Sequence, residues 1–194
     1  MTHHFVNILT WEYFIEKVGK RDINIDGFLL KVLIFVVTGL RVQKKSGLNF
    51  AHENLGQITE PVYLLAKPIE TDHEMIILPF YDNLEDIKLN DKLLNTLGSY
   101  KNVVIGISSP KQDFLAELIL DSYPDKNIYC LGAALYTNRI RSSEHVFWTL
   151  LAMLRADWRR TLVKLFNSIY FFFRALLFRR KMVKDFVRVY QHSF

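Results

Sequence analysis

The residues best suited to chemistry follow a short apolar stretch near the middle of the chain, Val103–Ile107. Small and polar residues come together there: Gly106, Ser108, Ser109, Pro110, Lys111, Gln112 and Asp113. This order predicts a buried strand, a tight loop and the first turn of a helix. Free backbone N–H groups at the start of a helix attract anions, so the pattern favours a diphosphate ligand. Many such turns bind nothing, and that alternative stays open.

A second candidate is the carboxylate of Asp26, which stands directly before Gly27. A carboxylate within hydrogen-bond reach of a hydroxyl group can act as a general base and remove its proton. The alternative is a plain turn, because Asp-Gly is a common turn pair. Metal sites are not expected, since His73 has no companion at ligand spacing and the terminal His3 and His4 carry little weight.

The elements that must position these residues alternate between strands and helices. Short apolar runs predict buried strands at Val62–Ala66, Met75–Leu78, Val103–Ile107 and Ile128–Leu131. Helical patterns lie at Trp11–Val18, Phe28–Val37, Leu84–Leu97 and Lys111–Ser122. This alternation is typical of a parallel sheet with crossover helices. We therefore expect an α/β fold with a Rossmann-like, mostly parallel sheet and flanking helices.

The charge of the chain divides sharply near residue 138. Residues 1–138 carry 13 Lys and Arg against 17 Asp and Glu, a net charge of −4, whereas residues 139–194 carry 12 against 3, a net charge of +9. This division predicts an α/β core over residues 1–138 and a helical, basic appendage over residues 139–194. The excess of positive charge favours an anionic partner. The single cysteine, Cys130, forms no internal disulfide, which suits a reducing compartment.

The appendage contains 17 mostly apolar residues, Leu162–Phe178, which Lys164 and Arg174 interrupt. A helix that crosses a bilayer needs about 20 apolar residues, so this stretch is not expected to cross one. On a helical wheel, Arg160, Lys164, Asn167 and Arg174 lie opposite the apolar side chains, as in a helix that lies within a membrane interface. The alternative is that the apolar face packs on the rest of the chain or on a partner subunit of an oligomer.

Several of these motifs together resemble the WecG/TagA/CpsF glycosyltransferases of bacterial cell-surface polysaccharide and teichoic acid synthesis. The most specific match is Gly106–Asp113, where that family usually has Gly-x-Gly-x-Pro-Lys-Gln-Glu. Here Ser108 replaces the second glycine and Asp113 replaces the glutamate. Ile25–Gly27 is similar to an apolar-x-Asp-Gly motif of the family.

Weaker matches extend the resemblance over most of the chain. They are Lys44–Asn49, Gly132–Ala134, Arg139 or Arg141, and the basic tail with Asp157 and Arg160. The early Thr-x-Asn element of the family is not preserved near Ile8–Thr10. The chain therefore resembles a divergent member of the family.

The resemblance implies an inverting transfer of a sugar from a UDP-sugar to an undecaprenyl-diphosphate-linked acceptor, in the synthesis of capsule, exopolysaccharide or teichoic acid. Asp26 would be the catalytic base, and no cofactor or metal ion is expected. The implied substrate-binding residues are Gly106, Ser108, Ser109, Pro110, Lys111, Gln112, Asp113, Gly132, Asn49, Arg141 and Arg160.

A bilayer-confined acceptor also implies a peripheral location at the cytoplasmic face of the inner membrane. There the basic cluster Arg179–Lys181 would bind anionic lipid, and truncation after Arg174 should weaken binding to liposomes.

Two other classes of function stay open. The first is a non-catalytic relative that acts as a membrane-surface binding module, because several motif positions are altered. The second is an unrelated α/β protein that binds nucleic acid through its basic tail. Nucleic acid is the less expected partner, because aromatic side chains grouped on one helical face suit acyl chains better than stacked bases.

Overall fold

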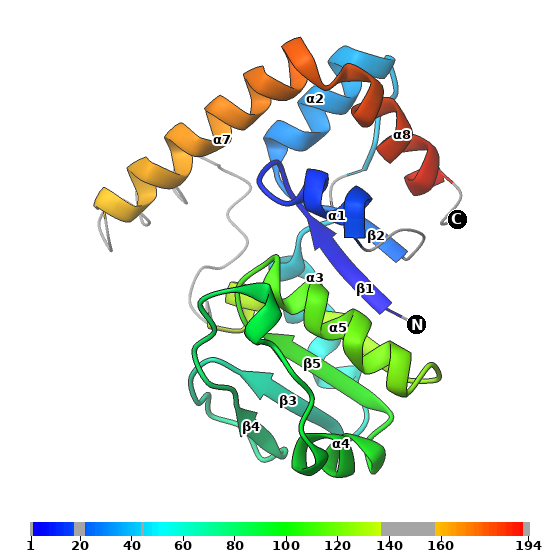
Figure 1. Ribbon diagram of the computed structural model, residues 1–194, viewed down its shortest axis with the longest axis vertical. Helices are drawn as coiled ribbons and strands as arrows, with labels where there is room; N and C mark the ends of the chain where they lie inside the picture. The colour runs from blue at the N-terminus through cyan, green and yellow to red at the C-terminus, as the bar shows by residue number, and fades with distance from the viewer. Residues whose placement is uncertain (1, 18–21, 44, 137–157, 192–194) are drawn as a thin grey trace.

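The computed structural model of the protein describes residues 2–17, 22–43, 45–136 and 158–191. Its centre is a six-stranded sheet in the order β2-β1-β6-β5-β3-β4, in which all neighbouring strands are parallel (Figure 1). The strands are β1 (Thr2–Val6), β2 (Asp22–Ile25), β3 (Pro61–Leu65), β4 (Met75–Ile77), β5 (Asn102–Gly106) and β6 (Asn127–Cys130). This confirms the expected α/β fold with a parallel, Rossmann-like sheet.

Helices connect the strands and follow the last one. Those within the described residues are α1 (Trp11–Lys17), α2 (Phe28–Thr38), α3 (Gly47–Asn54), α4 (Asp91–Gly98), α5 (Lys111–Ser122), α7 (Trp158–Phe178) and α8 (Arg180–Gln191), with the 3₁₀ helices η1 (Leu55–Gln57), η2 (Leu84–Asp86) and η3 (Gly132–Tyr136). Helix α5 has the predicted bounds, and the four predicted strands agree within one residue at each end. Strands β1 and β2 and helix α3 were not predicted.

The helix expected over Leu84–Leu97 is wrong as a single element. The chain forms η2 and then α4, with a break between them. The break has a local cause, because the side chain of Asn90 accepts a hydrogen bond from the Leu93 amide at 2.8 Å and so caps a new helix start. Asn83 and Asp86 form a capping box at η2 in the same way.

The two faces of the sheet are covered by different helices. On one face Ile105 of β5 packs with Leu97 of α4 and Leu115 of α5. On the other face Val104 packs with Leu135 of η3, and α3 covers the same side. Successive residues of a strand point to opposite faces, so β5 is buried on both sides and reads as a continuous apolar run.

The C-terminal helices complete the core over β1 and β2 instead of standing apart. A third buried cluster joins β1, β2, α1 and α2 to Ala175 of α7 and to Val183, Phe186 and Val187 of α8. The ring of Phe186 meets the Trp11 ring edge-on, with centroids 6.2 Å apart. Figure 1 shows α7 and α8 lying against α2. A separate appendage is therefore not confirmed, and the expected boundary near residue 138 falls outside the described residues.

Helix α7 carries two apolar faces, where the sequence predicted one. Ala175 is buried, and the half-buried Phe172 and Leu176 pack against the same core cluster. The opposite face is exposed along one line of residues: Val163, Phe166, Tyr170, Phe173 and Leu177. On a helical wheel, Phe166, Phe172 and Leu176 fall on one apolar face. The packing of α7 on α2 and α8 divides that face.

The polar side of α7 also differs from the expectation. Arg174, placed on a solvated face by the helical wheel, forms an ion pair with Glu12 of α1, with Nη1 and Oε2 3.1 Å apart. This ion pair links α7 to α1, which packs against β1 and β2. None of the helices within the described residues is long and apolar enough to cross a bilayer.

Candidate functional site

The carboxyl ends of the strands meet at one edge of the sheet, which is where ligands bind in open α/β sheets. β5 leads there into the loop Ile107–Pro110, β6 into Gly132 and β2 into Asp26. Two strands, β1 and β6, lie between β2 and β5, so the ends of β2 and β5 are about 14 Å apart. A ligand that touches both ends must therefore be an extended molecule.

Gly106 ends β5 in a space that admits no side chain. A Cβ atom there would lie 2.6 Å from Leu65 Cδ2 and 2.7 Å from Leu135 Cδ1. The hydroxyl of Tyr136 donates to the Gly106 carbonyl at 2.7 Å and accepts from the Ala66 amide at 3.1 Å. These bonds tie the ends of β3 and β5 to η3. Close packing at the edge is thus sufficient reason for this glycine.

The loop Ser108–Pro110 turns the chain from β5 into α5 and contains a cis peptide bond before Pro110. Gln112, in the first turn of α5, is only 4% exposed, and its Oε1 has no hydrogen-bond partner among the described residues. Gly132, with a φ of 54°, comes so close that a Cβ atom would lie 3.0 Å from that oxygen. A buried acceptor without a partner calls for an explanation, and a ligand that donates a hydrogen bond would supply one.

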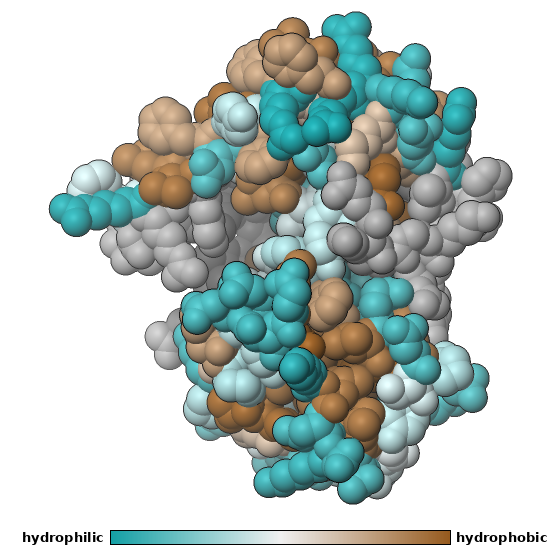
Figure 2. All heavy atoms as spheres, in the orientation of Figure 1, coloured by the Kyte–Doolittle hydropathy of each residue, from teal (hydrophilic) through white to brown (hydrophobic). Residues whose placement is uncertain are grey.

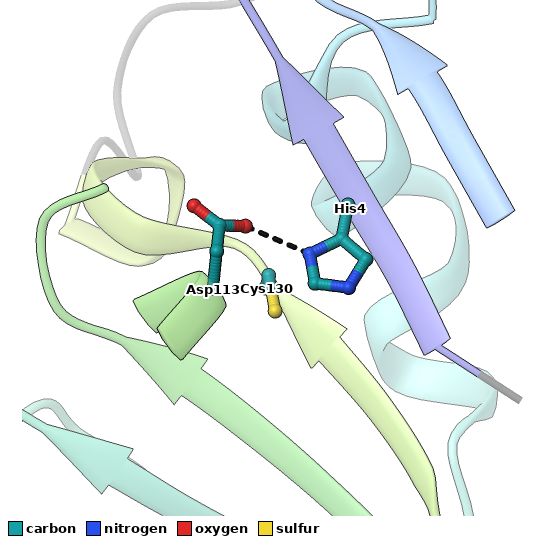
Figure 3. A group of neighbouring side chains, drawn as sticks. All are labelled: His4, Asp113 and Cys130. Carbon is teal, nitrogen blue, oxygen red and sulfur yellow. Dashed lines mark hydrogen bonds and ion pairs between the residues drawn. The ribbon is translucent and has the colours of Figure 1, made fainter. Parts of the chain in front are cut away.

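A closed polar cluster lies behind this loop and joins β1 to α5 (Figure 3). The carboxylate of Asp113 accepts a hydrogen bond from His4 Nδ1 at 2.8 Å and another from the hydroxyl of Ser109. His4 Nε2 lies 3.7 Å from Glu117 Oε1. His4 and Asp113 are both buried. Asp113 was expected to bind substrate, but its two oxygens are engaged inside the protein.

The electrostatics of the cluster favour a charged imidazole. Burial alone would lower the pKa of His4. Contacts with Cys130, Asp113 and Glu117 outweigh burial and raise that pKa well above 6.5. Burial raises the pKa of the Cys130 thiol, so the thiol stays neutral. The carboxylates of Asp113 and Glu117 are therefore the physical cause of the raised His4 pKa. Burial, with Asp113 and Glu117 nearby, also raises the pKa of Tyr13 to about 12.

The same cluster has the composition of a metal site. His4, Asp113 and Cys130 each offer one ligand atom, and these atoms lie within 4.8 Å of one another. The hydrogen bonds argue against that role, because both oxygens of Asp113 already accept one. The Cys130 thiol lies 3.9 Å from the Gln112 carbonyl, which can accept its weak hydrogen bond. We therefore describe a buried hydrogen-bonded cluster and assign no ion to it.

Lys111, also expected to bind substrate, points toward the loop that follows β4. Its ammonium group donates to the carbonyl of Tyr81 and lies 4.9 Å from the centre of the Phe80 ring. In this arrangement the lysine holds the β4–α4 loop against the start of α5. Its positive charge is thus engaged by the Tyr81 carbonyl and the Phe80 ring within the protein.

At the β2 end of the edge, Asp26 directly follows the strand, and its amide donates to the Val6 carbonyl at 2.7 Å. Gly27 has a φ of 91°, which lets the chain turn at once into α2. Asn7 follows β1 beside it, and a Cβ atom on Gly27 would lie 3.6 Å from Asn7 Cβ. The side chain of Asn7 accepts a hydrogen bond from the Leu9 amide at 2.8 Å. The polar residues Asn7 and Asp26 thus lie next to each other at the carboxyl ends of β1 and β2.

The remaining expected residues are distributed unevenly. Asn49 is exposed in the first turn of α3, and the Lys45 amide just before that helix donates to the Ile25 carbonyl at 3.0 Å. The chain just before α3 thus lies at the β2 end of the edge, while α3 itself contacts η3. Arg160 lies in the first turn of α7, and Arg141 lies outside the described residues.

Sequence reasoning missed His4 and Asn7. Both belong to β1 or directly follow it, and β1 itself was not predicted because two adjacent histidines hide its apolar pattern. The available signal was the run from Thr2 to Val6, in which Phe5 and Val6 precede the polar Asn7 much as other apolar strands precede polar loops.

Comparisons with known proteins do not add to this description. No family model, curated protein or solved structure matches the chain. The likeness to glycosyltransferases therefore rests on the motifs alone, and function has to be argued from the residues gathered at the sheet edge.

Proposed function

We propose that the protein is an inverting glycosyltransferase that moves a sugar from a UDP-sugar to a polyprenyl-diphosphate-linked acceptor. The observation that carries this proposal is the arrangement of the sheet edge. It brings the loop before α5 and the buried Gln112 to one end and the carboxylate of Asp26 to the other. The roughly 14 Å between the two strand ends suits a donor and an acceptor that meet between them.

The donor half lies at the β5–β6 end in this proposal. The backbone N–H groups of Ser109 and Lys111, at the start of α5, would face the diphosphate and stabilise its charge. Gln112 Oε1, which has no partner among the described residues, would accept a hydrogen bond from the nucleotide or the sugar. Arg141 and Arg160 would add positive charge near the leaving group, as the resemblance implies.

Asp26 is the proposed general base. Its carboxylate takes the proton of the acceptor hydroxyl while the hydroxyl oxygen forms a bond to the anomeric carbon. The bond from that carbon to the diphosphate oxygen breaks at the same time, and UDP leaves with the electron pair. Attack from the face opposite the diphosphate inverts the anomeric centre. We expect this chemistry to need neither a metal ion nor another cofactor.

Membrane contact through α7 is the second part of the proposal. The exposed line from Val163 to Leu177 faces away from the core, and Arg179, Arg180 and Lys181 are exposed beyond it. Figure 2 shows apolar and hydrophilic side chains alternating on this side of the molecule. Helix α2, which contacts α7, is also exposed at Phe35 and Val36. This mixture suits a peripheral site on anionic lipid at the cytoplasmic face of the inner membrane.

The catalytic part is tested with Asp26→Asn. We expect turnover of UDP-sugars with a lipid-linked acceptor to fall by about a thousandfold, while UDP binding stays within about twofold, because the base acts on the acceptor. Asp72→Asn, on an exposed loop, is the matched control. Undiminished turnover by Asp26→Asn would remove this residue from the role. UDP binding without turnover by the wild type would favour the non-catalytic alternative.

The membrane part is tested by substitution, because truncation after Arg174 would remove core residues of α8 as well. Phe166→Glu with Phe173→Glu should weaken binding to anionic liposomes by about tenfold or more without lowering the melting temperature. Phe80→Glu, at a phenylalanine that is 86% exposed in the loop after β4, is the control. If liposome binding is unchanged in the double variant, α7 is not the membrane contact. Salt-dependent binding to DNA alone would instead favour a nucleic-acid partner.

A further inference from the structure

A hydrogen-bonded chain connects the loop before α5 with the middle of β1. It runs from the Ser109 hydroxyl to one oxygen of Asp113, and from the other oxygen to His4 Nδ1. His4 and Asp113 are 109 residues apart in sequence and both are buried. Ser109 is the member of this chain that reaches the loop surface. The proposed catalytic roles do not use His4.

We propose that His4 is a positioning residue for the donor site: through Asp113 it holds Ser109, and with it the Ser108–Pro110 loop, in the shape that receives a diphosphate. This inference rests on the proposed function. It assigns a specific task to a histidine that makes no contact with the ligand.

The geometry favours this task over simple core filling. A buried polar group is costly unless it is hydrogen-bonded, and an apolar side chain of similar volume at position 4 would serve the core equally well. One oxygen of Asp113 accepts a hydrogen bond from His4 and the other accepts one from Ser109 in the loop. The orientation of the carboxylate therefore depends on β1, which carries His4. If the His4 bond is lost, Asp113 can rotate and Ser109 loses a fixed acceptor. Loop order should then fall before the fold does.

His4 is surrounded by groups that respond to its charge. Asp113 and Glu117 of α5 face its two ring nitrogens, and Cys130 of β6 and the Phe14 ring of α1 lie beside it. Tyr13 of α1 lies near the same two carboxylates, which together with its burial raise the pKa of its hydroxyl to about 12. The charged imidazole is the form that the carboxylates favour, so the positioning should weaken as the pH rises through the raised pKa of His4.

Two substitutions separate positioning from stability. Asn at position 4 offers an amide N–H where Nδ1 stood and can still donate to Asp113, whereas Gln offers it where Nε2 stood, toward Glu117. Both remove the charge, and Asn is the smaller of the two, so lost volume alone would make His4→Asn the more harmful change. We expect His4→Gln to weaken UDP binding, measured by calorimetry at pH 6.5, by about tenfold, and His4→Asn by no more than about threefold. Both variants should lose the decline of affinity that the wild type shows as the pH rises.

Ser109→Ala provides a second test of the proposal in case substitutions at position 4 prevent folding. It removes the loop end of the chain at a partly exposed residue and should also weaken UDP binding by about tenfold. Equal losses in His4→Asn and His4→Gln, or full affinity in both Gln and Ala variants, would overturn the proposal. If the wild type binds no UDP, the proposed function fails first. Positioning is then measured without ligand, because the amide NMR signals of Ser108, Ser109, Lys111 and Gln112 should shift in His4→Gln and not in His4→Asn.

Discussion

The two ends of the sheet edge are held in place by different parts of the chain. At the β5–β6 end, Gly106 is enclosed by Leu65 and Leu135, and Tyr136 bridges two strand ends. At the β1–β2 end, the turn at Asp26 rests on α1 and α2, which in turn are covered by α8 from the far end of the chain. Apart from the hydrogen bond between His4 of β1 and Asp113, the first end is thus fixed by residues between β3 and η3, whereas the second depends on the C-terminal helices.

This difference implies a division of labour. The proposed donor half is rigid and closely packed, so it should keep its shape when the C-terminal helices are perturbed. The proposed acceptor half shares a core cluster with the helices that would meet the membrane. A substitution in α7 or α8 should therefore disturb the structure around Asp26 more than the structure around Gln112.

The largest effect is expected from Phe186→Ala in α8. Phe186 is fully buried against Trp11, so its loss should lower the free energy of unfolding by about 3–5 kcal/mol. Phe178→Ala, at a phenylalanine that is 79% exposed, should change it by less than about 0.5 kcal/mol. Urea unfolding measures both.

Hydrogen exchange then locates the damage. In Phe186→Ala the amides of α2 should exchange faster, while those of β5 keep their protection. Equal loss of protection in both elements would show that the two ends of the sheet edge unfold as one cooperative unit. The β5–β6 end would then not be independent of the C-terminal helices.

The second effect comes from Gly106→Ala at the rigid end. The added methyl would meet two side-chain carbons at 2.6 and 2.7 Å, and we expect a loss of about 1–3 kcal/mol in unfolding free energy. Gly56→Ala is the control, because a Cβ atom there meets nothing within 4 Å. If Gly106→Ala is as stable as the control, Leu65 and Leu135 give way easily and this end is less rigid than its packing indicates.

The sequence predicts the β5–β6 end better than the β1–β2 end for a related reason. Helix α5 and strand β5 carry their own signals, an apolar run followed by a small-residue loop and a helix start. Strand β1 has two histidines, and its pairing with β6 brings together residues more than 100 positions apart. Long-range pairing leaves no local periodicity, so the short run from Thr2 to Val6 is the local signal of β1, and it does not reveal that His4 meets Asp113.

Helix α7 shows a second limit of sequence reasoning. Periodicity correctly predicts a helix with an apolar surface, but it cannot say which part of that surface the rest of the chain will cover. Ala175 is the buried centre of the packed face, yet a lone alanine carries little weight on a hydrophobic wheel. Tertiary packing, which the wheel does not contain, decided that Phe172 faces inward and Phe173 outward.

The third effect is a change with pH rather than a fixed loss. Because the folded-state pKa of His4 is raised above 6.5, its pairing stabilises the fold fully below pH 6.5 and loses that contribution as the pH rises through the raised value. The difference in unfolding free energy between the wild type and His4→Asn should therefore shrink with rising pH. His73→Asn, at an exposed histidine, is the control. A difference that grows with pH would mean that His4 is buried in its neutral form.

The smallest effect is expected from the ion pair between Arg174 and Glu12, which fastens α7 to α1. Its side chains are 30% and 17% exposed, so a double-mutant cycle with Ala should give a coupling of about 0.5–1 kcal/mol. The exposed pair of Arg188 and Asp185, 3.5 Å apart, should give less than about 0.3 kcal/mol. A coupling near zero at Arg174 would leave apolar packing alone to hold α7. The tilt of its exposed face, and with it the proposed membrane contact, would then be set by Ala175 and its neighbours.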